Sequence, residues 1–221
     1  ECTPDIDHCR RSALVPVNYP KNIENNPNTT AHWSEIIIAP DNEHISWTIL
    51  RSDIGAAACI GVLARKEDCY DVEQPRIIST LENFKADPQR EGYLIPQVIR
   101  GGEVKQFVRG GTAISVVGGK EGNTPNSVVQ PLDSLELEQI TFTPGYDETT
   151  IFSPDERLGI VMTSRASKKT DPAIFGRMPR PHGIQTSMGI SRYLYTYAVT
   201  GVRMMRKGNV GPVLIDIRKS M

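Results

Sequence analysis

Three acidic side chains carry the chemistry that the sequence most readily suggests. Asp147 and Glu148 follow a Pro-Gly loop in the second half of the chain, and Glu35 precedes an apolar run in the first half. Paired carboxyl groups, one acting as acid and the other as base or nucleophile, are the usual machinery of glycoside hydrolysis. We therefore take Asp147, Glu148 and Glu35 as candidate catalytic residues, provided that the fold brings them together.

Four further side chains are suited to holding a substrate. Arg51 and Arg165 each end a predicted strand, and their guanidinium groups could bind a uronic-acid carboxylate through paired hydrogen bonds. His32 and Tyr146 stand where the chain enters a first strand. Plainer roles stay open beside these, with Asp147 as a loop acid bonded to nearby backbone and the two arginines as solvated strand ends or bonds between sheets.

The elements that must position these residues are organised around two Pro-Asp turns. The runs Ile-Ile-Ile-Ala-Pro-Asp and Thr-Ile-Phe-Ser-Pro-Asp place Pro at positions 40 and 154, and each pair separates two β-rich segments. Pro presets φ for the first turn position, and Asp can bond its own backbone two residues on. The distance between the turns leaves room for an intervening unit of the same kind.

Short β-rich runs between turns predict three antiparallel sheets after an extended arm over residues 1–31. The sheets are expected over residues 32–80, 104–141 and 149–217, which together form the region 32–221. The predicted strands are 33–39, 44–51, 56–64 and 76–79 in the first sheet, 104–108, 112–117, 127–130 and 135–141 in the second, and 149–153, 157–163, 173–178, 192–199 and 213–217 in the third. The polar stretch 81–102 is expected to be loop.

The order of strand, Ser-Pro-Asp turn and strand resembles the TolB-type propeller repeat, a WD40-like unit in which Ser-Pro-Asp-Gly joins the innermost strand of a blade to the second. The resemblance implies an all-β partial β-propeller of about three four-stranded blades. Glu156 replaces the usual Gly, so we expect a turn without positive φ at that position. Closed propellers have at least four blades. We therefore expect another chain or a missing segment of the same precursor to complete the wheel.

Three segments are similar in form and order to secreted fungal saponin hydrolases and their bacterial relatives, namely Cys2–Asp5, Ile38–His44 and Pro144–Arg165. The similarity is best over residues 104–178, and it supplies no catalytic motif. It implies an extracellular glycoside hydrolase that removes a glucuronosyl group from a saponin-type glycoside, so a small glycoside or glycan is the expected partner. The alternative is a non-catalytic propeller scaffold that binds protein or glycan.

Cysteine usage favours an oxidising compartment. Four cysteines fall into two close-spaced pairs, which predict local disulfides Cys2–Cys9 and Cys59–Cys69. Four free thiols are the alternative. The sequon Asn28–Thr30 lies in a polar loop and supports a secreted glycoprotein, with Asn28 as the glycosylated residue. A chain that begins with Glu is expected of a processed protein.

Charge and motifs exclude several classes of function. The 25 basic and 26 acidic residues leave a net charge of −1, which favours neither nucleic acid nor an anionic membrane as partner. Gly-rich phosphate loops, Gly-x-Ser-x-Gly elbows, His-Glu-x-x-His and Cys-x-x-Cys are all absent from the sequence. A propeller lyase would need a metal held by several histidines, and the four here are scattered. We expect no cofactor and no metal site.

Overall fold

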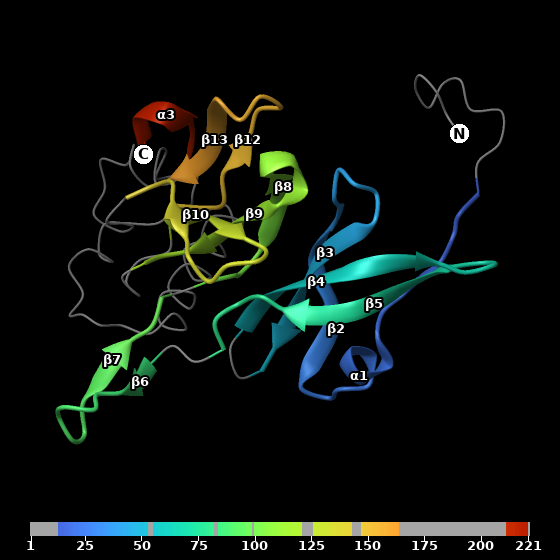
Figure 1. The fold of residues 1–221 in the computed structure, drawn as a ribbon, viewed down its shortest axis with the longest axis horizontal. Coiled ribbons are helices and arrows are strands. Elements are labelled where there is room, and N and C mark those ends of the chain that lie inside the picture. Colours follow the sequence, from blue (N-terminus) through green and yellow to red (C-terminus); the bar gives the residue numbers. More distant parts are fainter. Residues whose placement is uncertain are drawn as a thin grey trace, which may run out of the picture.

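The computed structural model describes residues 13–52, 55–81, 84–98, 100–120, 126–142, 147–163 and 211–220. In these ranges the chain is built mainly of β-strands, in three antiparallel sheets and one separate hairpin (Figure 1). The α-helices there are single turns, α1 (Lys21–Glu24) and α3 (Ile217–Ser220). Neither has the length or the apolar character needed to cross a membrane. In the described ranges the prediction of an all-β fold is confirmed.

The first sheet is a meander of four antiparallel strands with one added edge strand, in the order β1-β5-β4-β3-β2. Its strands are β1 (Val17–Asn18), β2 (Thr29–Ile38), β3 (His44–Arg51), β4 (Gly55–Arg65) and β5 (Tyr70–Ile77). The predicted strand over 44–51 is correct at both ends. The predicted fourth strand over 76–79 was placed too late, because the long β4–β5 hairpin starts its return at Tyr70. β1, from the arm, pairs parallel with β5.

The second and third sheets repeat the antiparallel pattern. The second is ordered β11-β10-β9-β8, and the third β12-β13-β14. Their strands are β8 (Val104–Val108), β9 (Ala113–Gly118), β10 (Asn126–Pro131), β11 (Glu138–Gln139), β12 (Ile151–Phe152), β13 (Leu158–Thr163) and β14 (Gly211–Asp216). A short 3₁₀ turn, Arg109–Gly111, joins β8 to β9. The strands predicted over 173–178 and 192–199 lie outside the described residues.

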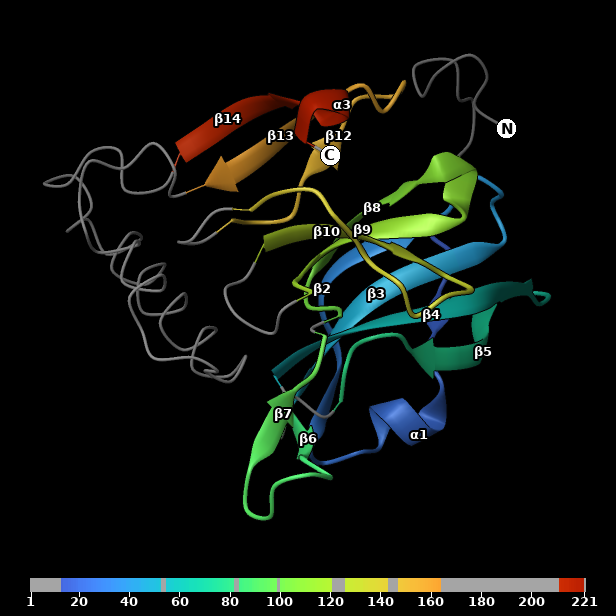
Figure 2. The same ribbon diagram turned by 60° about the vertical axis from the view of Figure 1, so that its left-hand side comes forward.

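A two-stranded hairpin was missed by the sequence prediction. β6 (Phe84–Ala86) and β7 (Leu94–Pro96) pair with each other inside the stretch expected to be loop. They join no other sheet, and Figures 1 and 2 show them projecting from the body of the molecule. Strands of three residues between polar turns are too short to give a detectable alternation.

The three sheets pack face to face through two apolar clusters. In one, Ala58 and Ile60 of β4 lie with Val116 and Val128 of the second sheet. In the other cluster, Val129 and Ile140 of the second sheet region lie with Phe152, Val161 and Ile215 of the third sheet. Burial of each large aliphatic side chain stabilises the fold by about 1.5–3 kcal/mol. The first strands adjoin one another, since β2 contacts β8 and β8 contacts β12 (Figure 2).

The two Pro-Asp turns have the same hydrogen-bonded frame. In the first, the Ala39 amide donates to the His44 carbonyl at 2.8 Å. In the second, the Ser153 amide donates to the Leu158 carbonyl at 2.9 Å. The two turns, whose Pro-Asp pairs are 114 residues apart in the sequence, therefore share the same backbone hydrogen bond, as the sequence predicted.

The acids of these turns act as predicted, by bonding nearby groups. Asp41 Oδ1 accepts the amides of His44 at 2.9 Å and Glu43 at 2.8 Å, and these bonds lower the pKa of Asp41 to about 2. The hydroxyl of Ser153 donates to Asp155 at 2.6 Å and is the main cause of the lowered pKa of Asp155. Both carboxylates stabilise their turns.

The expected conformation at Glu156 was wrong. Its φ is +55°, and Asn42, at the same place in the first turn, has φ of +60°. The turn itself demands the left-handed region, whichever residue occupies the position. Asn tolerates this region and Gly enters it freely, whereas Glu does so at a cost of about 1 kcal/mol or more.

Candidate functional site

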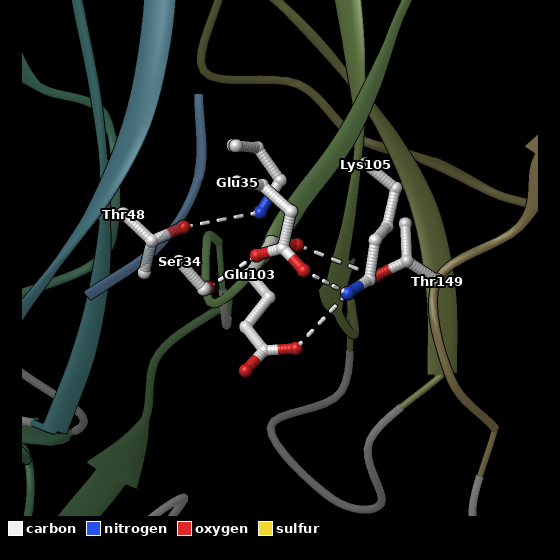
Figure 3. A network of polar contacts seen from close by, with 7 residues as sticks. Ser34, Glu35, Thr48, Glu103, Lys105 and Thr149 are labelled. Atoms are coloured by element: carbon white, nitrogen blue, oxygen red, sulfur yellow. Dashed lines mark hydrogen bonds and ion pairs between the residues drawn. The ribbon is translucent and has the colours of Figure 1, made fainter. Parts of the chain in front are cut away.

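A network of polar side chains lies where the first strands of the three sheets adjoin (Figure 3). It involves Ser34 and Glu35 of β2, Thr48 of β3, Glu103 just before β8, Lys105 of β8 and Thr149 just before β12. These residues span more than half of the sequence, so only the packing of the sheets unites them.

Lys105 is the centre of the network. Its ammonium group donates to Glu35 Oε1 and, at 3.2 Å, to Glu103 Oε2. The hydroxyl of Ser34 donates to the other oxygen of Glu35. The side chains of Lys105, Glu35 and Glu103 are 21%, 26% and 32% exposed, so the cluster is accessible from solvent. Two carboxylates and one ammonium leave a local charge of −1.

The backbone explains how these side chains reach one another. Val104 is completely buried, whereas Glu103 and Lys105 are partly exposed. The pairing of β8 with β9 shifts register between Val104 and Gln106, so Lys105 lies in an irregular part of its strand. On β2, the pairing with β3 shifts register on both sides of Ser34, once between Thr30 and Ser34 and again between Ser34 and Ile37. Glu35 lies in this irregular segment with φ of +40°. Bulges of this kind redirect a side chain, and here the side chain meets Lys105.

Two neutral contacts join the sheets beside the charges. The Val104 amide donates to Thr48 Oγ1 at 3.4 Å, which joins the second sheet to the first. The Thr149 hydroxyl donates to the Glu103 carbonyl at 3.3 Å, which joins the approach to β12 to the second sheet. The site is therefore held by all three sheets.

Electrostatics fixes the protonation of Lys105. Burial acts to lower its pKa, but hydrogen bonds and charge attraction from Glu35 and Glu103 outweigh burial, and the pKa of Lys105 is raised. The group is an ammonium ion at neutral pH, which excludes it as an amine nucleophile. Both carboxylates contact this one nitrogen, so their nearest oxygens are at most about 6 Å apart. Acid pairs in retaining glycosidases are about 5–5.5 Å apart.

Of the three predicted catalytic acids, Glu35 alone belongs to the network. Asp147 is completely buried, and neither carboxylate oxygen has a hydrogen-bond partner. It forms an isolated β-bridge with Thr163. Neither the predicted access to substrate nor the alternative bonding to neighbouring backbone is seen for this side chain. Glu148 is partly exposed, and its amide donates to the Met162 carbonyl at 2.8 Å.

Among the described side chains, Arg51 is the predicted binding residue that can be placed relative to Glu35. Arg51 ends β3, three residues beyond Thr48, which corresponds to about 10 Å along a strand. It lies outside the network drawn in Figure 3. His32 is part of β2, but its side chain is not described. Tyr146 and Arg165 lie outside the described residues.

The predicted disulfide between Cys59 and Cys69 is absent, and both thiols are free. β4 and β5 pair Arg65 with Tyr70, so Cys69 lies in the hairpin turn. Cys59 lies six residues before Arg65 on β4, which corresponds to about 20 Å along a strand. Disulfides need Cα atoms within about 4.4–6.8 Å. Burial raises the pKa of the Cys59 thiol to about 12. The predicted Cys2–Cys9 pair lies outside the described residues.

Asn28, the predicted glycosylation site, is exposed in the turn before β2. Its amide donates to Asn26 Oδ1 at 2.9 Å, and its carbonyl accepts the Ser52 amide at 3.0 Å. The backbone is thus held in place while the side chain faces solvent.

The sequence prediction missed Glu103, Lys105, Ser34 and Thr48. The sequence did hold one signal, because charged Glu103 and Lys105 flank apolar Val104 at the start of the strand predicted to be the first of the second sheet. In the described ranges no group of three or more His, Cys, Asp or Glu side chains could hold a metal ion.

Comparison of the chain with models of protein families and with the sequences of curated proteins returned no match. Fold and site define an all-β protein of stacked antiparallel sheets with a charged network at their junction.

Proposed function

We propose that the chain forms three consecutive blades of a β-propeller. Three observations support this. The sheets are antiparallel apart from the edge strand β1, the first strands β2, β8 and β12 adjoin in order, and the sheets pack face to face. Propeller blades are four-stranded sheets arranged around a central channel. On this arrangement the charged network lies at the channel wall, and further blades come from another chain or from the same precursor.

The proposed activity is hydrolysis of a glycoside in an extracellular setting. The observation that carries it is the pair of partly exposed carboxylates, Glu35 and Glu103, held on either side of Lys105. Glu35, fixed between an ammonium and the Ser34 hydroxyl, is suited to act as nucleophile or base. Glu103 is the proposed acid. A saponin-type glycoside with a glucuronosyl group is the substrate that the sequence resemblance favours.

Turnover of aryl glucuronides, aryl glucosides and saponin glycosides by the purified chain tests this activity. Glu35→Gln and Glu103→Gln should each reduce kcat at least about 100-fold, the range of acid–base contributions. Glu136→Gln is the matched control, because Glu136 is an exposed carboxylate in the loop before β11. Unchanged kcat in both site variants, or an equal loss in the control, would refute the assignment.

A second function, non-catalytic binding of a glycan or protein, is favoured by one observation. The Lys105 ammonium neutralises the charge of one carboxylate and links β8 to β2, which is the usual role of a structural ion pair. Calorimetric titration with the same glycosides distinguishes the two functions. Heat of binding without turnover, lost in Glu35→Gln, would support the binding module over the hydrolase.

A further inference from the structure

A cavity of about 340 Å³ lies where the chain enters and leaves the projecting β6–β7 hairpin. This volume falls in the range of about 300–1,000 Å³ that small-molecule sites occupy. The described residues that line the cavity come from both arms of the hairpin and its stem, namely Thr80, Leu81, Lys85, Gln97, Val98 and Arg100. They share no member with the charged network around Lys105, so the cavity is a separate candidate site.

Hydrogen bonds hold the entering and leaving segments together. The Thr80 amide donates to the Arg100 carbonyl at 2.8 Å, and the Arg100 amide donates to Thr80 Oγ1 at 2.9 Å. The Thr80 hydroxyl donates in turn to the Val98 carbonyl at 2.7 Å. The Gln130 side chain of β10 donates to the Ile78 carbonyl at 2.7 Å, which fixes the entering segment to the second sheet. Walls that are held in place lower the entropic cost of binding a ligand.

The charged residues among those that line the cavity, Lys85 and Arg100, are both cationic. The hydrogen bonds described for Arg100 engage its backbone, and its side-chain Nε is buried without a hydrogen-bond partner. Buried donors in native proteins nearly always have an acceptor, so this guanidinium is suited to an additional oxygen partner. Lys85 is exposed on β6 and adds a second positive charge. The planar fork of a guanidinium matches a carboxylate in particular.

The uncharged lining residues suit the carbon body of a hydroxylated ligand. The Gln97 side-chain nitrogen donates to the Ile95 carbonyl at 3.3 Å, and the described contacts leave its carbonyl oxygen to accept a hydrogen bond from a hydroxyl group. Leu81 and Val98 supply apolar contact for ring carbons. A few placed polar groups beside apolar surface are the usual composition of a small-molecule site.

We propose that this cavity binds a small hydroxylated carboxylate of the sugar-acid class. The ligand carboxylate bonds to the guanidinium of Arg100 beside the charge of Lys85, and a ligand hydroxyl donates to Gln97. This binding does not rest on hydrolysis at Glu35 and Glu103. The cavity holds its ligand whether or not the charged network turns over a glycoside, so either proposal can fail alone.

Chemical-shift titration by nuclear magnetic resonance tests the ligand class, with glucuronate, glucose and inorganic phosphate as probes. Glucuronate should saturate and should shift the Nε–H signal of Arg100 together with the backbone amides of Thr80 and Val98. Glucose lacks the carboxylate and phosphate lacks the sugar ring, so both should bind more weakly. An absence of saturable binding, or glucose or phosphate binding as tightly as glucuronate, would overturn the proposal.

Variants locate the binding within the cavity. Arg100→Met should weaken glucuronate binding at least about tenfold, the effect of losing a charge-assisted hydrogen bond. Lys85→Met should weaken it by a smaller factor, because solvent screens this exposed charge. Arg90→Met is the matched control, because Arg90 is 63% exposed and pairs with Asp87 in the hairpin turn. Equal affinity of the three variants and the wild type would refute the site.

Gln97→Leu separates recognition of the sugar from simple charge attraction. This variant should weaken glucuronate binding and leave phosphate binding unchanged, because Gln97 is assigned to a hydroxyl group. The same spectra report whether each variant is folded, and the exposed Lys85 keeps the charge test available if the Arg100 variant does not fold. Equal effects of Gln97→Leu on glucuronate and phosphate would contradict the assignment to a sugar acid.

Discussion

Replacement of Lys105 by Met tests whether the charged network joins the sheets. Met keeps the length of the side chain and removes the ammonium that contacts Glu35 and Glu103. Exposed ion pairs contribute about 0–1 kcal/mol, and breaking a buried pair costs about 3–5 kcal/mol. With side chains 21–32% exposed, the network lies between these limits. We expect a loss of about 2 kcal/mol.

Urea unfolding followed by tryptophan fluorescence measures this loss. With a slope of about 2 kcal/mol/M, the midpoint should fall by about 1 M. Lys66→Met is the control, because Lys66 Nζ lies 2.7 Å from Glu73 while the two side chains are 43% and 49% exposed. It should lower the midpoint clearly less than Lys105→Met does, because solvent screens this exposed pair. An equal cost for both variants would refute the argument from burial.

The pH dependence gives an independent check on Lys105. Its pKa is raised in the folded chain, so the folded state binds this proton more tightly than the unfolded state. The contribution of Lys105 is thus fully present below the ordinary lysine value of about 10.4 and is lost as pH rises through the higher folded value. The stability difference between wild type and Lys105→Met should be constant from pH 6 to 9 and shrink above about pH 10.5. A difference that grew with pH would contradict the assignment.

Three further predictions concern the sheets themselves. Asp41→Asn should lower Tm at pH 7, because the pKa of Asp41, lowered to about 2 in the folded chain, means that its carboxylate stabilises the fold above the unfolded pKa. This stabilisation is lost on acidification between about pH 4 and 2, so the variant should lose less stability than the wild type over that range. Thermal melts across pH measure both effects. Thiol alkylation with peptide mapping should label Cys69 in the folded chain and Cys59 only after unfolding, and a peptide cross-linked through both would contradict the free thiols. Gly61→Ala should cost about 1–3 kcal/mol by urea unfolding, since its added carbon would lie 2.6 Å from a buried valine methyl, whereas Gly211→Ala, with nothing within 4 Å, should cost much less.

Strand positions could be predicted where local chemistry decides them. His44–Arg51 alternates Ile45, Trp47 and Ile49 toward one core, and the Pro-Asp turn before it fixes where it begins. The ends of β5 could not be predicted, because they depend on the length of the hairpin. Glu156 shows a related limit, since the turn imposes a conformation that the residue disfavours.

The site could be predicted only in part. Glu35 was found because it precedes an apolar strand, but its partner Lys105 lies 70 residues away and meets it through sheet packing. Asp147 was assigned to an accessible loop, and its burial depends on contacts with β13 that no local pattern reveals. The spacing of Cys59 and Cys69 suggested a bridge, whereas the register of the hairpin keeps the two thiols apart.

The projecting hairpin of β6 and β7 offers a practical entry point to this protein. Its turn, with Gln89 and Arg90 exposed, is tied mainly to Asp87, and in the described ranges the hairpin pairs with no other sheet. Isolated two-stranded hairpins contribute little to global stability, and exposed tips accept inserted sequence. We expect an epitope or a fluorophore-binding peptide placed between Gln89 and Arg90 to report on the protein without disturbing the stacked sheets.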